Sequence, residues 1–160
     1  MVALQSAPQV QTIPLADPAA TEALAAAYAA RLVPGDVIAL TGDLGAGKTV
    51  FARSLIRSLG RAAGIDIEHV PSPTFTLVQL YDMAEFTLHH FDLYRLEAPE
   101  EAWEIGIEDA FAGGVSVIEW AERIEHLLPP HHIHIDLAFG SDETARIATV
   151  TGLENRPETT

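Results

Sequence analysis

Residues 42–49 have the types and the spacing that are needed to bind phosphate groups. They read Gly-Asp-Leu-Gly-Ala-Gly-Lys-Thr and match the pattern G-x-x-x-x-G-K-[ST] at every fixed position. Glycines let the backbone curl with its N–H groups toward an anion, and a helix that begins here adds the positive end of its dipole. The ammonium group of Lys48 would neutralise the β- and γ-phosphates, and the hydroxyl of Thr49 could take one position on an octahedral Mg²⁺.

The surroundings of this P-loop pattern support the prediction. The apolar run 37–41 precedes it and is typical of a strand that is buried on both faces of a parallel sheet. The chain has nine basic residues but a single lysine, and that lysine is Lys48. We therefore predict that the nucleotide is bound by Asp43, Leu44, Gly45, Ala46, Gly47, Lys48, Thr49 and Val50.

A P-loop ATPase also needs an acid near its Mg²⁺, usually at the end of a neighbouring strand. Glu119 ends the apolar run 115–119, and Asp92 ends the less apolar run 88–92. We expect Glu119 to bind the metal, directly or through a water molecule, together with Thr49. Asp92 is then expected to lie behind the metal ligands, without binding the metal directly, or to orient a water molecule. The spacing is compatible with either acid as the direct ligand.

Three further features lie near these acids in the sequence. The rigid, polar loop 71–75 could bring the hydroxyl of Thr74 to a γ-phosphate, as switch loops do, or it could be a simple proline-stiffened connection. His89 and His90 are expected to be strand residues with one side facing solvent. Trp120 is expected to be a packing residue.

The elements that must position these residues follow a mixed order of helices and strands. Helices are predicted over 19–32, over 48–59, over an acidic segment from Pro99 to about 113, and up to Leu128. Strands are predicted over 37–41, 75–81, 86–94, 115–118, 133–139 and 145–150, the second and third forming a hairpin. This order predicts an α/β fold, with a single P-loop NTPase domain of three layers around a mixed, mainly parallel central sheet. We assign the domain to residues 13–152, with flexible ends at 1–12 and 153–160.

Composition limits the classes of partner. The 160 residues suit one domain, and the formal net charge of −14 disfavours direct binding to DNA, to RNA or to an anionic membrane surface. The absence of cysteine excludes disulfides and thiolate metal sites. No apolar run approaches the roughly 18 residues of a membrane span, and the first residues lack a signal-peptide pattern. A cytoplasmic protein is therefore expected.

The nucleotide is expected to be ATP or ADP. Guanine-specific P-loop proteins typically read the base with an [NT]-K-x-D loop, and this chain has no lysine outside the P-loop. Two other functions use the same phosphate site. One is a small-molecule phosphotransferase, and the other is a nucleotide-dependent docking protein with negligible hydrolysis.

Five sequence blocks, in order along the chain, resemble the TsaE (YjeE) family, the small bacterial ATPases of tRNA threonylcarbamoyladenosine biosynthesis. The resemblance covers roughly residues 15–150, and the blocks are 42–49, 71–75, 90–96, 105–111 and 117–122. It implies a weak ATPase that binds ATP or ADP with Mg²⁺ and works with the proteins TsaD and TsaB. Those partners transfer threonylcarbamoyl to adenosine 37 (t6A) of tRNAs that read codons beginning with A, so tRNA would be contacted only through them.

The resemblance also implies roles for individual residues. Lys48 and Thr49 would hold phosphate and Mg²⁺, and Glu119 would be the metal-associated acid. Asp92 corresponds to the family's Walker B-like acid and Thr74 to its switch-like threonine. The adenine would be contacted somewhere within residues 13–17. The acidic segment that begins near Glu97 is a candidate docking surface for the partners, or simply a solvated acidic helix.

Overall fold

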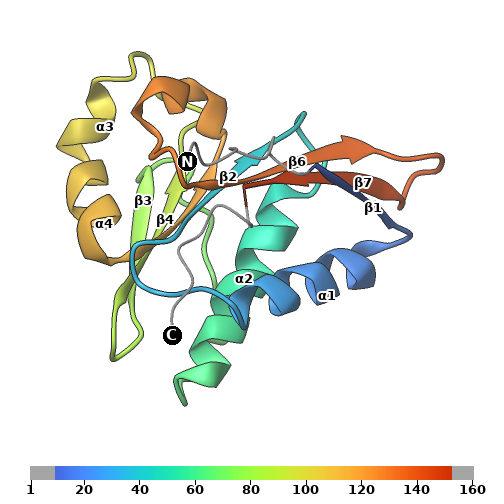
Figure 1. The fold of residues 1–160 in the computed structure, drawn as a ribbon, viewed down its shortest axis with the longest axis horizontal. Coiled ribbons are helices and arrows are strands. Elements are labelled where there is room, and N and C mark those ends of the chain that lie inside the picture. The colour runs from blue at the N-terminus through green and yellow to red at the C-terminus, as the bar shows by residue number, and fades with distance from the viewer. Residues whose placement is uncertain (1–9, 153–160) are drawn as a thin grey trace, which may run out of the picture.

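The computed structural model describes residues 10–152, and within this range one seven-stranded sheet forms the centre of the molecule (Figure 1). Its strands are β1 Gln11–Leu15, β2 Val37–Thr41, β3 Val78–Asp82, β4 Thr87–Asp92, β5 Val115–Glu119, β6 Ile133–Phe139 and β7 Arg146–Thr151. The helices are α1 Pro18–Ala29, α2 Lys48–Ala62, α3 Glu101–Glu104 and α4 Ile107–Gly113, with a 3-10 helix, η1, over Ala121–Leu127.

The strand order is β1-β7-β6-β2-β5-β4-β3. The four middle strands, β6, β2, β5 and β4, run parallel to one another, whereas β3, β7 and β1 pair antiparallel with their neighbours. Parallel strands need crossover connections, which the intervening helices supply. The predicted α/β fold with a mixed sheet, parallel at its centre, is confirmed.

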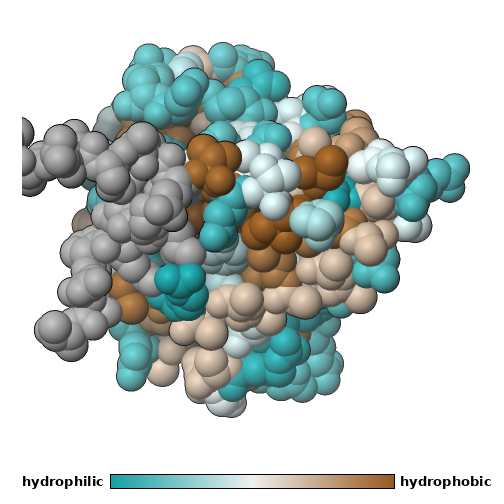
Figure 2. Space-filling model, turned by 45° about the vertical axis from the view of Figure 1, so that its right-hand side comes forward, coloured by the Kyte–Doolittle hydropathy of each residue, from teal (hydrophilic) through white to brown (hydrophobic). Residues whose placement is uncertain are grey.

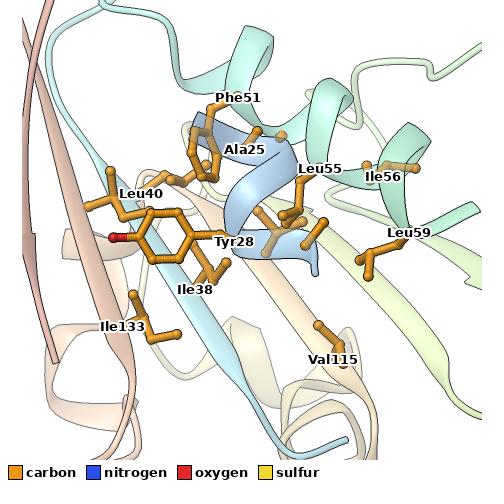
Figure 3. Close-up of a cluster of buried hydrophobic side chains, with 14 of the residues drawn as sticks. Ala25, Tyr28, Ile38, Leu40, Phe51, Leu55, Ile56, Leu59, Val115 and Ile133 are labelled. Carbon is orange, nitrogen blue, oxygen red and sulfur yellow. The ribbon is translucent and has the colours of Figure 1, made fainter. Parts of the chain in front are cut away.

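Two hydrophobic cores lie on opposite faces of the sheet. The larger core holds α1 and α2 against the face that carries Ile38 and Leu40, and in it the rings of Tyr28 and Phe51 lie 6.4 Å apart (Figure 3). The other core holds α3, α4 and η1 against the face that carries Val37 and Ala39. Because side chains alternate along a strand, β2 contributes to both cores. This explains why the sequence of β2 is apolar almost throughout.

Helix α1 begins at Pro18, one residue before the predicted start, and it ends earlier than predicted. The carboxylate of Asp17 accepts the N–H of Ala20 at 2.9 Å, and Pro18 occupies the first helical position. The helix ends at Ala29, before the predicted end at residue 32. Its inner face is formed by small residues and Tyr28, so α1 can lie close to α2.

Several predicted boundaries differ from those in the structure. Strand β1 was not predicted, and it begins at Gln11 within the segment taken as a flexible end. The sequence did not predict this strand because it contains Pro14, and proline usually argues against a strand. Proline is tolerated here because β1 is an edge strand. The acidic helix is interrupted at Gly106, which has a φ of 85°. The segment after Trp120 is a kinked 3-10 helix rather than an α-helix.

The first β-run after the proline-rich loop also begins later than predicted. Residue 75 lies in a turn, and β3 starts at Val78. Leu77 has a φ of 70°, and its N–H donates to the carbonyl oxygen of Pro73 at 2.7 Å. The loop therefore closes on itself before the strand begins.

The helices over residues 10–152 fall short of the length and apolar character that crossing a membrane requires. The predicted flexibility of residues 1–9 and 153–160 lies outside the described residues.

Candidate nucleotide-binding site

The predicted site residues meet where the parallel strands end. The carboxyl ends of β2, β5 and β4 lie side by side, with Leu40 opposite Glu119 and Glu119 opposite Asp92. Ligands of open α/β sheets bind outside this edge of the strands. The sheet thus brings together the P-loop and both predicted acids, which are separated by 27 or more positions in the sequence.

The P-loop joins the end of β2 to the start of α2. Gly42 has a φ of 138°, and a Cβ atom there would lie 2.2 Å from the carbonyl oxygen of Leu137. Gly47 has a φ of 112° and directly precedes Lys48, the first residue of α2. Only glycine allows both the backbone turn and the close approach to β6 at position 42. The loop therefore leads into a helix N-terminus, as phosphate binding requires.

Lys48 lies inside this loop and is only 4% exposed. Its Nζ donates hydrogen bonds to the carbonyl oxygens of Gly42 and Asp43, the latter at 3.0 Å, and lies 4.0 Å from the centre of the Trp120 ring. Burial lowers the pKa of Lys48, while nearby carboxylates, first that of Glu122 and then that of Glu119, act in the opposite direction. The cation is held among carbonyls, carboxylates and an aromatic face, the groups that a desolvated ammonium needs.

Trp120 has a direct place in the site as well as a packing role. Its φ of 60° is unusual for a bulky residue and turns the chain sharply after Glu119. The indole ring lies against Tyr94, with ring centres 4.9 Å apart, and against Lys48. The strained backbone therefore holds an aromatic wall beside the P-loop.

Glu119 contacts the first turn of α2. Its Oε1 accepts a hydrogen bond from the Thr49 hydroxyl at 2.6 Å, and its Oε2 lies 2.6 Å from Nε2 of His90. The expectation that His90 has a solvated side is wrong, because the residue is fully buried. Strand β4 lies between β3 and β5, and His90 faces the core beneath α2. This contact was missed because it depends on the register between two strands.

Asp92 is held by a second set of hydrogen bonds. Its Oδ2 accepts from the hydroxyl of Thr74 at 3.1 Å, and its Oδ1 accepts from the backbone N–H of Tyr94 at 3.1 Å. The hydroxyl of Thr74 also lies 2.8 Å from that of Ser72. The proline-rich loop is thus tied to the end of β4 at the residue that the sequence singled out.

These residues surround a cleft of about 320 Å³, within the range of small-molecule sites. It is lined by Leu44, Gly45, Gly47, Lys48, Thr49, Val50, Ser72, Thr74, Asp92, Tyr94, Glu119 and Trp120. Asp43 and Ala46 were predicted to bind nucleotide but do not line the cleft. Ala46 is fully buried, and its N–H donates to the carbonyl oxygen of Asp43. Ser72 and Tyr94 were not among the predicted site residues, although they lie within blocks 71–75 and 90–96 of the family resemblance.

The donors in the cleft suit Mg²⁺. Thr49, Glu119 and Asp92 offer hydroxyl and carboxylate oxygens, the hard ligands that Mg²⁺ prefers. Across residues 10–152, no three His, Cys, Asp or Glu side chains form a cluster that could hold a metal by themselves. Mg²⁺ at a nucleotide is normally held by one or two protein groups together with phosphates and water, so this sparse set fits it.

Comparison with known proteins agrees with this geometry. Residues 15–147 match the family model described as "Threonylcarbamoyl adenosine biosynthesis protein TsaE". A tRNA threonylcarbamoyladenosine biosynthesis protein TsaE from Rickettsia bellii is 43% identical over 131 residues, covering 82% of this chain and 88% of its own. The protein of the same name from Bacillus subtilis is 38% identical over 143 residues, covering 89% and 85%.

A solved structure shares the fold. The crystal structure of YdiB from Bacillus subtilis superposes with a TM-score of 0.72 at 31% sequence identity, covering 94% of this chain and 90% of that one. The family match spans both the P-loop and the strand ends that carry Asp92 and Glu119. On this evidence the chain belongs to the TsaE family.

Proposed function

We propose that this protein is a Mg²⁺-dependent ATPase that supports threonylcarbamoylation of adenosine 37 in tRNAs reading codons that begin with A. It would act in the cytoplasm with TsaD and TsaB and would not perform the transfer itself. One observation carries the ATPase part of the proposal. Lys48, Thr49 and Glu119 line one cleft, with a 2.6 Å hydrogen bond between the hydroxyl and the carboxylate. The relatives' names support the pathway.

In this proposal each side chain has a separate task. The P-loop backbone and Lys48 bind the phosphates and neutralise the charge that develops on them. Thr49 and Glu119 hold Mg²⁺, which when bound offsets negative charge on the phosphate oxygens. Asp92, which accepts a hydrogen bond from Thr74, would orient an attacking water molecule, and the Thr74 hydroxyl would lie at the γ-phosphate. The Trp120 ring excludes solvent from one side of Lys48.

Exposed hydrophobic side chains beside the cleft support an interaction with partner proteins. Leu44 is 74% exposed on the P-loop, and Phe75, next to Thr74, is 79% exposed. Arg95 lies over the ring of Phe75, with its guanidinium carbon 4.2 Å from the ring centre. Large exposed apolar groups often mark interaction sites. Figure 2 shows one face of the molecule, on which hydrophobic side chains gather near the centre among hydrophilic ones.

The net charge bears on the route to tRNA. At −14, the protein would be repelled by a phosphate backbone. We therefore place the contact with tRNA on the partner proteins.

The test is ATP hydrolysis by the purified protein, alone and with TsaD and TsaB, together with t6A formation on an unmodified tRNA. We expect the partners to raise Mg²⁺-dependent turnover and Lys48→Ala to abolish both turnover and t6A formation. Arg57→Ala, which removes a cation from the same helix away from the cleft, should change neither. Turnover that is indifferent to the partners would contradict the proposal, and a phosphorylated small-molecule acceptor would replace it with a phosphotransferase.

A further inference from the structure

A buried histidine lies directly behind the acid proposed to bind the metal. His90 is fully buried on β4, and its Nε2 is 2.6 Å from Oε2 of Glu119 on β5. Its other ring nitrogen, Nδ1, is buried and has no hydrogen-bond partner among the described residues. A buried polar side chain of this kind costs stability unless it is paired. The hydrogen bond to Glu119, which the described structure gives as the ring's one polar contact, is therefore the feature that needs an explanation.

The partners assign the proton on the His90 ring. A carboxylate oxygen can only accept a hydrogen bond, so Nε2 must donate to Glu119. The contact thus places a proton on Nε2 of His90.

This hydrogen bond determines which oxygen of Glu119 faces the cleft. Oε2 is held by His90 from within the sheet, and Oε1 lies beside the Thr49 hydroxyl. The main chain of Glu119 is fixed too, because its carbonyl oxygen accepts the N–H of Leu93 at 3.1 Å. With Oε2 occupied, Oε1 is the oxygen that remains directed at the first turn of α2. His90 therefore restricts the carboxylate to one orientation.

We propose that His90 is a positioning residue, which holds Glu119 in the orientation that binds Mg²⁺ at the nucleotide. The inference rests on the proposed function, because it concerns the same metal. Residues that hydrogen-bond to metal ligands typically contribute about 10- to 100-fold to metal affinity or activity. Here the effect should appear in the coupling between Mg²⁺ and nucleotide and should leave metal-free nucleotide binding unchanged.

The experiment measures ADP binding by calorimetry, in Mg²⁺ and in EDTA, so that hydrolysis is not involved. The ratio of the two dissociation constants reports the Mg²⁺ coupling. In His90→Leu we expect this ratio to fall by roughly tenfold or more, while the value in EDTA stays the same. In His90→Gln, whose amide nitrogen can take the place of Nε2, we expect the coupling to be largely restored.

His89 provides the matched control. It is the adjacent histidine on β4, and it stacks on Phe91 away from Glu119. His89→Leu removes a partly buried imidazole from the same strand and should leave the Mg²⁺ coupling unchanged. Thermal unfolding of all variants shows that each remains folded at the temperature of the titration.

A second measurement is independent of nucleotide. Nitrogen-detected NMR of the imidazole rings should show a slowly exchanging Nε2–H on His90, assigned by its loss in His90→Leu. A wild type that does not bind ADP overturns the proposed function and this inference together. If the wild type shows Mg²⁺ coupling, this inference alone is overturned when His90→Leu retains that coupling or when Nε2 of His90 carries no proton.

Discussion

Thr49 and Glu119 lie 70 positions apart in the sequence, yet Oγ1 of the first and Oε1 of the second are 2.6 Å apart. The hydrogen bond joins the first turn of α2 to the end of β5, across the base of the cleft. A cation that takes the threonine oxygen as a ligand has this carboxylate beside it. The P-loop and Glu119 therefore form one site, although the local sequence around each does not reveal that the two are close in space.

Removing the charge of Lys48 should weaken nucleotide binding without unfolding the protein. Lys48→Met keeps an unbranched chain against Trp120 but loses the ammonium group that would contact phosphates. Since hydrogen bonds to charged groups are worth about 1.5–3 kcal/mol, we expect ATP and ADP to bind roughly 10- to 100-fold more weakly. Calorimetric titration measures the affinity, and thermal unfolding provides the control. Unchanged affinity would show that phosphate is bound elsewhere.

Substitutions of Glu119 and of Asp92 should change ATP hydrolysis in different ways. Glu119→Gln and Asp92→Asn each replace a carboxylate by an amide of the same shape. We expect the first to raise the Mg²⁺ concentration for half-maximal hydrolysis by at least about tenfold, since even groups behind a metal ligand contribute that much. The second should mainly lower the maximal rate. A Mg²⁺ titration of hydrolysis separates them, and the opposite result would make Asp92 the direct ligand.

Gly42 should be far less tolerant of a side chain than Gly35. Both have positive φ, but a Cβ at Gly42 would lie 2.2 Å from the backbone of Leu137, whereas the described structure has no atom within 4 Å of a Cβ at Gly35. Gly35→Ala should cost only the backbone strain, about 1–2 kcal/mol. Gly42→Ala adds overpacking and should cost roughly 2–5 kcal/mol. Urea unfolding measures both, and equal costs would contradict the close packing of the P-loop on β6.

Stability should fall as the pH drops below about 6.5, the ordinary histidine pKa. Burial, assisted by His132, lowers the pKa of His134, while Asp136, Glu122 and Glu125 act in the opposite direction. Burial also lowers the pKa of His89. Below pH 6.5 the unfolded chain then binds more protons at these positions than the folded one, so acid favours unfolding.

Urea unfolding at about pH 7.5, 6.5 and 5.5 measures this dependence. His134→Gln should reduce the slope of the unfolding free energy against pH. His126→Gln changes an exposed histidine and serves as the control. If His134→Gln leaves the slope unchanged, His134 does not contribute to the acid sensitivity.

Local sequence patterns predicted the parts of the site that are formed by neighbours in the chain. The P-loop is such a part, because its turn and the helix start after it are encoded in eight consecutive residues. The apolar runs ending at Glu119 and Asp92 also predicted that both acids lie at strand ends. The parallel sheet then placed the two acids next to each other.

The remaining features depend on contacts between distant segments. His90 was assigned a solvated side because a single strand does not reveal that both neighbouring strands and α2 cover it. Pro14 hid β1, since its tolerance depends on that strand being at the edge of the sheet. The left-handed backbone conformation of Gly106 interrupts the acidic helix. The sequence did not predict this interruption because the residues on both sides of Gly106 favour a helix.

The position of Lys48 under the ring of Trp120 also has a use in chemical labelling. The sequence contains one lysine, so an acylating reagent finds one side-chain amine, and that amine lines the cleft described above. Burial lowers its pKa and so enriches the neutral, nucleophilic form, while the indole ring restricts the reagent's approach. The mass increment on a single peptide then reports how accessible this amine is and whether a ligand covers it. The unmodified protein thus carries its own footprinting probe.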